Sequence, residues 1–219
     1  MHRKHHHQPS IVALALLLTG LLAWPTAGLA QLGGVLPPLP TPTPSASTVT
    51  GQATAAQAVL LGFLGTATTT SLATTGISGT NSESDVSQLT GSIPALLGAD
   101  TLSAATYSYP DQVDSTASLA NVGLNVAGIT ISADSVVAYA SQALGTAGTG
   151  TSYIDNLAIN GVTVGVSGDP NQTISIPGGQ VVLNEQTIAS DGSTVVNAIH
   201  VTVNGVADVV IASATAGIS

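Results

Sequence analysis

Positively charged side chains are almost absent from this chain of 219 residues, which contains only two Lys or Arg residues. Both of them, Arg3 and Lys4, stand at the N-terminus. All 11 Asp and Glu residues lie further along, so loss of the two cations lowers the formal charge from −9 to −11. An acidic chain of this kind repels the phosphates of nucleic acids and of anionic lipids. We therefore expect neither nucleic acid nor a membrane surface as a partner of the mature protein.

Cysteine is absent as well, and His200 is the only histidine after residue 30. A disulfide framework is therefore excluded, and so are Cys-His and Ser-Lys catalytic sites. The sequence also contains no G-x-S-x-G elbow, phosphate-binding loop, H-E-x-x-H zinc motif or dinucleotide fingerprint. We predict no catalytic residues and no cofactor, and we expect a protein that is not an enzyme.

The N-terminal segment has the order of a secretory signal peptide. Residues 1–10 are basic, residues 11–24 are apolar, and residues 25–30 are small and turn-prone, with Gly28 and Ala30 suited to a cleavage site. The apolar run is shorter than the roughly 20 residues that span a bilayer, so a retained membrane anchor is the less favoured alternative. Residues 31–46 are rich in Pro and predict an extended linker. We expect one folded domain over residues 47–219 and a secreted or cell-envelope location.

Three stretches of the second half share one pattern, in which aliphatic residues alternate with small polar residues and the alternation shifts across a two-residue loop. The loops are Ala127-Gly128, Asn160-Gly161 and Asn204-Gly205. A β-hairpin with a two-residue turn produces this shift, and Asn-Gly is its strongest short signal. Further strands are predicted at residues 173–176, 181–188 and 208–215, because β-branched residues dominate there.

These patterns predict an all-β protein, an antiparallel β-sandwich built from hairpins with two-residue turns of the Asn-Gly type. The Ala-rich residues 47–74 favour strands because of their Thr content, with a short helix at 55–61 as the alternative. Residues 76–100 are expected to form a long irregular excursion. Few aromatic residues are available, so the core is expected to consist of Val, Ile, Leu and Ala.

His200 is the one side chain of the predicted domain that titrates near neutral pH. If its strand pairs with the strand that contains Glu185, the two side chains meet and form an ion pair. We favour a structural role for this pair over an acid–base or metal-binding role, because one histidine cannot make a zinc site alone. A carboxylate-dependent glycoside hydrolase is the alternative, with candidates Asp134, Asp155, Asp169 and Glu185.

Calcium binding is an alternative interpretation of three turn residues. Asp169, Asn171 and Asp191 offer oxygen ligands of the right kind, but the chain has no D-x-[DN]-x-[DN]-G loop. Asp and Asn also favour turns without any metal. Turn formation is therefore the favoured interpretation of these three residues.

Two blocks resemble the bacterial choice-of-anchor P family of exported surface proteins. The first runs from Asn171 through Pro177-Gly178 to Leu183-Asn184-Glu185-Gln186, and the second is Val196-Asn197-Ala198-Ile199-His200-Val201. The resemblance covers roughly residues 47–219. It implies a surface protein with no established activity, whose relatives carry different C-terminal sorting signals. This chain ends without an LPXTG-like motif, so we expect release or non-covalent retention.

These observations together predict an exported, non-enzymatic β-domain with a structural or adhesive role at the cell envelope or in the extracellular space. Its expected partners are a cell-wall or matrix glycan or protein. Self-association is a third option, because the chain has no Lys to protect the edges of its sheets. The alternative is a secreted glycoside hydrolase or a carbohydrate-binding module.

Overall fold

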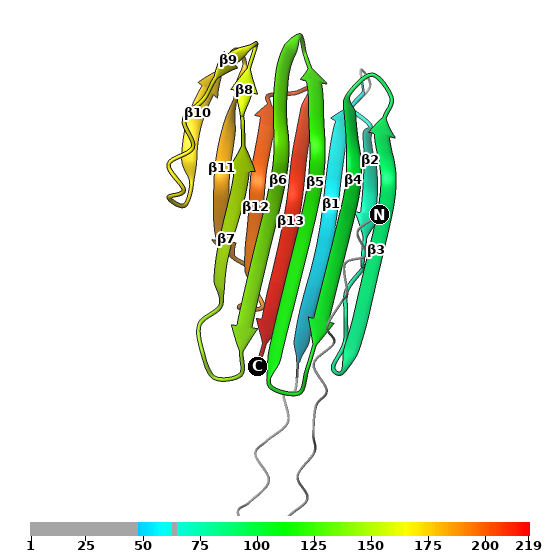
Figure 1. Ribbon diagram of the computed structural model, residues 1–219, viewed down its shortest axis with the longest axis vertical. Helices are drawn as coiled ribbons and strands as arrows, with labels where there is room; N and C mark the ends of the chain where they lie inside the picture. The colour runs from blue at the N-terminus through cyan, green and yellow to red at the C-terminus, as the bar shows by residue number, and fades with distance from the viewer. Residues whose placement is uncertain (1–47, 63–64) are drawn as a thin grey trace, which may run out of the picture. The chain divides into compact units, whose positions relative to one another are not determined.

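The computed structural model describes residues 48–62 and 65–219. The predicted signal peptide (1–30) and linker (31–46) lie outside these residues. The described chain is all-β and consists of two antiparallel sheets that pack face to face, as the sequence predicts (Figure 1). No helix in the described ranges is long and apolar enough to cross a bilayer.

Sheet A has six strands. In spatial order they are β10 (Gln172–Ile176), β11 (Gly179–Ile188), β12 (Thr194–Val203), β13 (Ala207–Ile218), β1 (Val49–Leu61) and β2 (Ala67–Thr74). The last four strands of the chain form a meander, and β1 pairs with the far side of β13. Backbone hydrogen bonds of 3.0 Å join Thr48 and Ser219 in both directions. The two ends of the domain are thereby fixed side by side.

Sheet B has seven strands. They are β3 (Ser82–Ile93), β4 (Leu97–Ser108), β5 (Gln112–Val126), β6 (Ile129–Ala143), β7 (Thr149–Asp155), β8 (Ala158–Ile159) and β9 (Val162–Thr163). Strands β3 to β6 form a meander in sequence order, and both β7 and β8 pair with β6. β5 and β6 each contain 15 residues, about 50 Å of extended chain. Long backbone ladders of this kind supply rigidity that the chain cannot obtain from disulfides.

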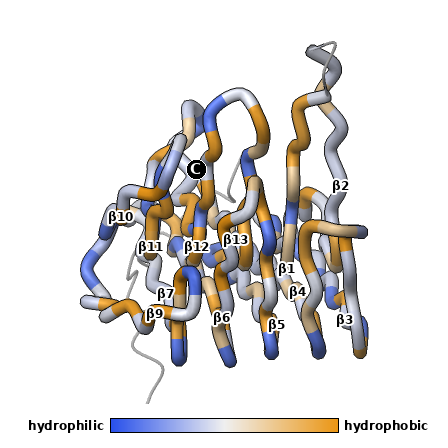
Figure 2. Tube along the Cα trace, turned by 90° about the horizontal axis from the view of Figure 1, so that it is seen from above, coloured by the Kyte–Doolittle hydropathy of each residue, from blue (hydrophilic) through white to orange (hydrophobic). Residues whose placement is uncertain are grey.

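The core lies between the sheets, where β13 covers β5 and β6 while β1 covers β4 and β5. Its largest fully buried side chains are aliphatic, among them Leu102, Leu119, Ile199 and Ile211. Many alanines fill the remaining space, and none of the buried residues in the described chain is aromatic. Figure 2 shows hydrophobic and hydrophilic residues alternating along the strands of both layers. The predicted aliphatic core is confirmed.

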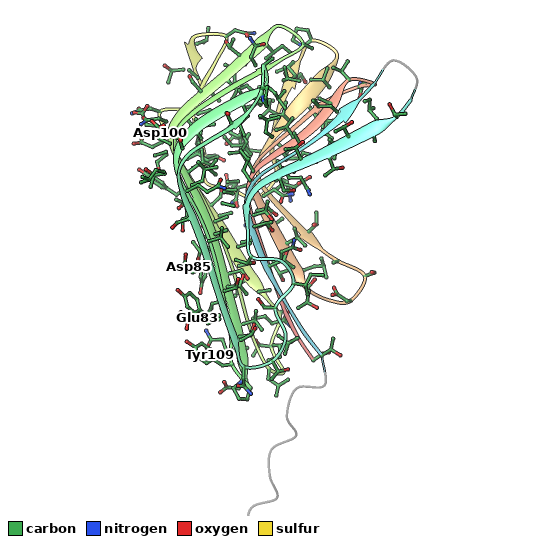
Figure 3. All side chains as sticks on the ribbon, turned by 90° about the vertical axis from the view of Figure 1, so that its right-hand side faces the viewer. Glu83, Asp85, Asp100 and Tyr109 are labelled. Carbon is green, nitrogen blue, oxygen red and sulfur yellow. The ribbon has the colours of Figure 1, made fainter. Side chains whose placement is uncertain are left out.

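The alternation of buried and exposed residues inverts along one line in each sheet, which we call the inversion line. In sheet A it passes through Asn184, Ala198, Ala212, Ala55 and Ala73, where the regular ladder is interrupted on β11, β12, β13, β1 and β2. In sheet B it includes Asn121 and Asp134. Positive φ angles at Ala212 (53°) and Asn121 (49°) rotate the chain, so the opposite set of side chains faces the core beyond the line. Figure 3 shows sheet B bending at the level of Asp100.

Two of the three predicted two-residue turns are confirmed. Asn160 and Gly161 adopt φ of 51° and 75°, and Ile159 pairs with Val162. The Ala127-Gly128 turn likewise has two positive φ angles, and it connects Val126 to Ile129. Both positions of a type I′ turn require positive φ, which these residue pairs supply.

The prediction for Asn204-Gly205 is wrong by one residue. Val203 pairs with Ala207, so the loop contains Val206 as a third residue, and the Val206 N–H donates to the Val203 carbonyl at 3.0 Å. Only Gly205 of the loop has a positive φ, of 69°. The longer loop keeps Ala207 on the buried side of the sheet and leaves Val206 at the exposed tip.

The excursion expected at residues 76–100 is also wrong, because β3 and the start of β4 occupy most of it. The polar residues of β3 suggested a loop, yet this strand lies at the edge of the sheet and faces solvent on much of its surface. Residues 47–74 resolve in favour of strands, with β1 covering the helix alternative at 55–61.

Candidate functional site

Three strands of sheet A bring a histidine and two carboxylates together on the outer face. The structure places Glu185 (β11) beside His200 (β12), with 2.8 Å between Glu185 Oε2 and His200 Nδ1. Asp208 (β13) lies on the other side, with its Oδ2 at 3.1 Å from His200 Nε2. Asn197 Nδ2 also donates to Glu185 Oε2, at 2.7 Å. We call Glu185, His200 and Asp208 the histidine clamp.

The surroundings of His200 favour its charged form. Burial of the ring opposes protonation, but hydrogen bonds and negative charge from Glu185 and Asp208 outweigh it, so the pKa of His200 is raised above its ordinary value. An imidazolium donates from both ring nitrogens, which is the arrangement that two flanking carboxylates require. A histidine held in this form has no free nitrogen to accept a proton from a substrate. The geometry therefore supports a structural lock across three strands.

Asp208 is the member of the clamp that sequence reasoning missed. The predicted two-residue turn at Asn204-Gly205 shifts the partner strand by one position, which moves Asp208 away from the polar side of His200. With the observed register, Asp208 pairs with Thr202 and lies diagonally from His200 on the same face. Asp208 could have been identified from the sequence only with the correct length of the loop between β12 and β13.

The calcium candidates serve as turn residues. Asp191 accepts from the Ser193 N–H and hydroxyl and from Thr50 Oγ1, and these bonds, led by that of the Ser193 hydroxyl, lower its pKa. Asn171 Oδ1 accepts from the Gln186 N–H at 2.9 Å, and the Asp169 N–H donates to Ser167 Oγ. Within residues 48–62 and 65–219, no group of three or more His, Cys, Asp or Glu side chains could hold a metal. Calcium binding stays an untested prediction.

The hydrolase candidates are distributed over both sheets. Asp134 accepts from Asn156 Nδ2 at 2.7 Å on β6, and Asp155 lies at the end of the neighbouring β7. Asp169 stands in the loop before β10, and Glu185 belongs to the histidine clamp. Glu185 is thus committed to bonds within sheet A.

The outer face of sheet B carries a second group of chemically distinctive residues, which sequence reasoning did not single out. One cross-strand row runs from Glu83 (β3) through Tyr107 (β4) and Asp114 (β5) to Ser141 (β6). Asp85 follows Glu83 by two positions and is exposed on the same side of β3. Because residues 76–100 were expected to be irregular, no strand partner was available to bring Glu83 and Tyr107 together.

Asp114 in the middle of this row is fully engaged. Its oxygens accept from the Tyr139 hydroxyl at 2.7 Å and from Gln112 Nε2 at 2.8 Å. Burial raises the pKa of Asp114, but hydrogen bonds from Ser141, Tyr139 and Gln112 lower it by more. Burial, followed by the bond and charge of Asp114, raises the pKa of Tyr139. This carboxylate is a stable anion and does not act as an acid near neutral pH.

The carboxylate of Glu83, by contrast, is exposed and unbonded. Neither Glu83 nor Asp85 has a side-chain hydrogen bond or ion pair with any part of the chain that the structure describes. Glu83 borders a pocket of about 260 Å³ together with Tyr107 and Tyr109. Figure 3 shows Glu83 and Tyr109 next to each other on the outer side of sheet B, with Asp85 further along. A free carboxylate beside two aromatic rings can receive a cation.

A wider hollow lies on sheet B beyond the inversion line. It has a volume of about 670 Å³, and its lining includes Gly98, Gly123 and Ser132. These three residues follow one another across β4, β5 and β6, and the glycines lack the side chains that would fill the surface. The hollow offers space but no charged or aromatic side chain.

No match is found when the chain is compared with protein-family models, curated proteins and solved structures. The resemblance to choice-of-anchor P proteins therefore stays a prediction. The functional argument rests on the residues themselves.

Proposed function

We propose that this chain is an exported, non-enzymatic domain with an adhesive or structural role at the cell envelope or in the extracellular space. Its contact surface is the outer face of sheet B around Glu83, Asp85, Tyr107 and Tyr109, which we call the sheet B face. The observation that carries the proposal is the pairing of unbonded carboxylates with tyrosines on this face.

The residue types of this face suit contact with another molecule. Tyrosine combines a large apolar surface with a hydroxyl and is enriched in protein interfaces. All four tyrosines of the chain belong to sheet B or its turns, and Tyr109 and Tyr153 are more than half exposed. The carboxylates add an attraction for cationic partners. The binding of His200, the one histidine after residue 30, by two carboxylates argues against acid–base catalysis.

Fractionation of the cells that produce the protein tests this proposal. An antibody against residues 47–219 is used to compare the protein in medium, wall and membrane fractions. Recovery in the wall or matrix, with release by salt, supports contact through charged residues. A Glu83→Gln/Asp85→Asn double variant should move into the medium, whereas an Asp169→Asn control should stay with the wall. Wild-type protein that is found free in the medium, with none bound to wall or matrix, contradicts the adhesive or structural role and favours the hydrolase or another soluble role.

Self-association through β3 is the second candidate. β3 pairs only with β4, and its Leu89 side chain is 86% exposed. The strand contains neither Lys nor Pro, the residues that commonly protect sheet edges. Sedimentation of the purified protein tests this role, since Leu89→Lys should dissociate any oligomer formed through this edge. A wild-type monomer at high concentration excludes the role.

A further inference from the structure

We propose that the pocket between Glu83, Tyr107 and Tyr109 binds a primary ammonium group, and that this group is the lysine side chain of a partner protein. The proposal deepens the proposed function and rests on it, because it names the chemistry that the sheet B face recognises. We call this pocket the ammonium pocket.

The geometry of the pocket is defined by paired strands and tight turns. Its lining consists of Asn81, Ser82, Glu83, Tyr107, Ser108 and Tyr109. Glu83 and Tyr107 are directly opposite each other on β3 and β4, where side chains lie about 5 Å apart. The Tyr109 N–H donates to the Gln112 carbonyl at 2.7 Å, and Ser82 Oγ donates to the Gly79 carbonyl at the same distance. Both ends of the pocket are therefore held before any ligand arrives.

The chemistry of the lining matches an ammonium ion. A carboxylate forms short, charge-assisted hydrogen bonds with N–H donors, and the faces of tyrosine rings attract cations. Residues 5–219 contain no Lys or Arg, so the chain after its first four residues has no cationic side chain of that kind to offer Glu83. Apart from Arg3 and Lys4, an ammonium or guanidinium group for this pocket comes from another molecule.

Asp114 belongs to the same cross-strand row, but its carboxylate stabilises the fold. It accepts hydrogen bonds from Tyr139 and Gln112, whereas Glu83 accepts none from the described residues. Tyr107 lies between the two carboxylates in the cross-strand row. The sheet thus satisfies its inner carboxylate with its own donors and leaves the outer one available.

The size of the pocket favours a single side chain over a sugar ring. Its volume of about 260 Å³ is below the range of roughly 300–1,000 Å³ that is usual for small-molecule sites. A lysine side chain is unbranched, so its methylene groups can lie along the tyrosine rings while the ammonium reaches Glu83. An amino sugar carries the amine directly on a bulky ring and needs a wider platform.

Titration of the full-length protein with a lysine probe tests the proposal. The chain has four tyrosines, so selective ¹³C labelling gives four sets of ring signals, which Tyr→Phe variants assign. We expect Nα-acetyl-lysine methyl amide to shift the signals of Tyr107 and Tyr109 and to leave those of Tyr139 and Tyr153 in place. The Nα,Nε-diacetyl form is the matched neutral probe, because acetylation removes the charge, and it should cause no shift.

Two variants separate the pocket from general attraction by an acidic surface. Glu83→Gln should weaken binding of the lysine probe about tenfold or more, because it removes the charge-assisted bond. Asp169→Asn removes an equal charge but lies in the loop before β10 and belongs to neither the pocket nor the sheet B face, so binding should stay within about twofold. Unchanged Tyr139 signals show that each variant is folded.

Several outcomes would overturn the proposal. Equal shifts of all four tyrosines, or equal weakening by both variants, would show non-specific attraction. Tighter binding of glucosamine than of the lysine probe would show that the amine comes from a glycan. Failure of this titration leaves the fractionation result of the proposed function intact, and the reverse also holds, so the two ideas fail separately.

Discussion

The outer faces of the two sheets differ in how completely their charged residues are bonded within the protein. On sheet A, the imidazole of His200 bridges Glu185 and Asp208 at 2.8 and 3.1 Å. On sheet B, Glu83 and Asp85 have no side-chain partner within the described residues. One sandwich therefore carries a face on which the charges are bonded internally and a face on which two carboxylates, Glu83 and Asp85, are available to other molecules.

The difference follows from the scarcity of cations. His200 is the one histidine of the described residues, so it can neutralise carboxylates at one place only, in the middle of sheet A. Elsewhere the chain uses neutral donors, such as Tyr139 for Asp114 and Asn156 for Asp134. A carboxylate with neither kind of donor, such as Glu83, contributes little to the fold. Substitution of such an unbonded carboxylate should therefore change stability little.

The largest expected effect comes from removing the clamp. His200→Ala leaves Glu185 and Asp208 without the donor that they share, while only 21% of the Glu185 side chain is exposed. We expect the free energy of unfolding to fall by about 2 kcal/mol, because a poorly solvated carboxylate loses a charged hydrogen bond. Urea unfolding at pH 6 measures this difference. A loss below about 0.5 kcal/mol, the range of ordinary surface substitutions, would contradict the structural role.

The pH dependence of stability should separate the two faces further. The pKa of His200 is raised in the folded state, so the clamp contributes fully below the unfolded pKa of about 6.5 and is lost as pH rises through the folded pKa. The pKa of Asp114 is lowered, so its contribution is present above about pH 3.8 and is lost as pH falls through the folded pKa.

Unfolding curves of wild type and variants across this pH range give the test. The stability difference between wild type and His200→Ala should shrink from pH 6 to pH 9, whereas the difference for Asp114→Asn should shrink only in acid. A His200→Ala difference that stays constant up to pH 9 would show that the imidazole does not act through its charge.

The sequence predicted the all-β class, the sandwich and most hairpins because these depend on local signals. Asn160-Gly161 and Ala127-Gly128 specify their turns through positive φ, and the alternation of aliphatic residues specifies the buried face. The contact between Glu185 and His200 was predicted by assuming that their strands are neighbours. It depends on the inversion at Asn184, because regular alternation would place Glu185 on the buried side with Val181 and Leu183.

Other features depend on interactions that the local pattern does not contain. The inversion lines arise because strands bend together across a whole sheet, and a buried Ala212 with φ of 53° has no special signature in the sequence. β3 was missed because an edge strand needs few aliphatic residues. Because β3 was missed, the pairing of Glu83 with Tyr107 was not predicted, and the sheet B face was not predicted either.

A smaller effect is expected within sheet B itself. Tyr139→Phe removes one hydrogen bond to Asp114, and we expect a loss of about 1 kcal/mol in unfolding free energy. Tyr153→Phe is the matched control, because this tyrosine is 60% exposed and its hydroxyl has no partner in the described structure. Urea unfolding of the two variants side by side should show a clear difference. Equal stability would mean that the Asp114 bonds do not hold the face together.

A substitution at Thr101, where the ladder between β3 and β4 is interrupted, should instead increase the free energy of unfolding. Thr101 is exposed and β-branched and has φ of 48°, a conformation that costs most residues roughly 1 kcal/mol. Thr101→Gly should therefore stabilise the protein by up to about 1 kcal/mol. Ser103→Gly, on the same strand outside the line, should destabilise it by about 0.5–1 kcal/mol. If both variants are destabilised alike in thermal unfolding, the inversion in sheet B carries no strain at Thr101.

The smallest stability effect should belong to the residue that matters most for contact. Glu83→Gln removes an exposed charge that bonds to nothing in the described structure and lies near Asp85, so unfolding free energy should change by less than about 0.5 kcal/mol. Binding of the lysine probe should nevertheless be largely lost. A residue that stabilises the fold shows the reverse, as His200 does. A Glu83→Gln variant that unfolds as easily as His200→Ala would place Glu83 among the structural charges and remove the contrast between the two faces.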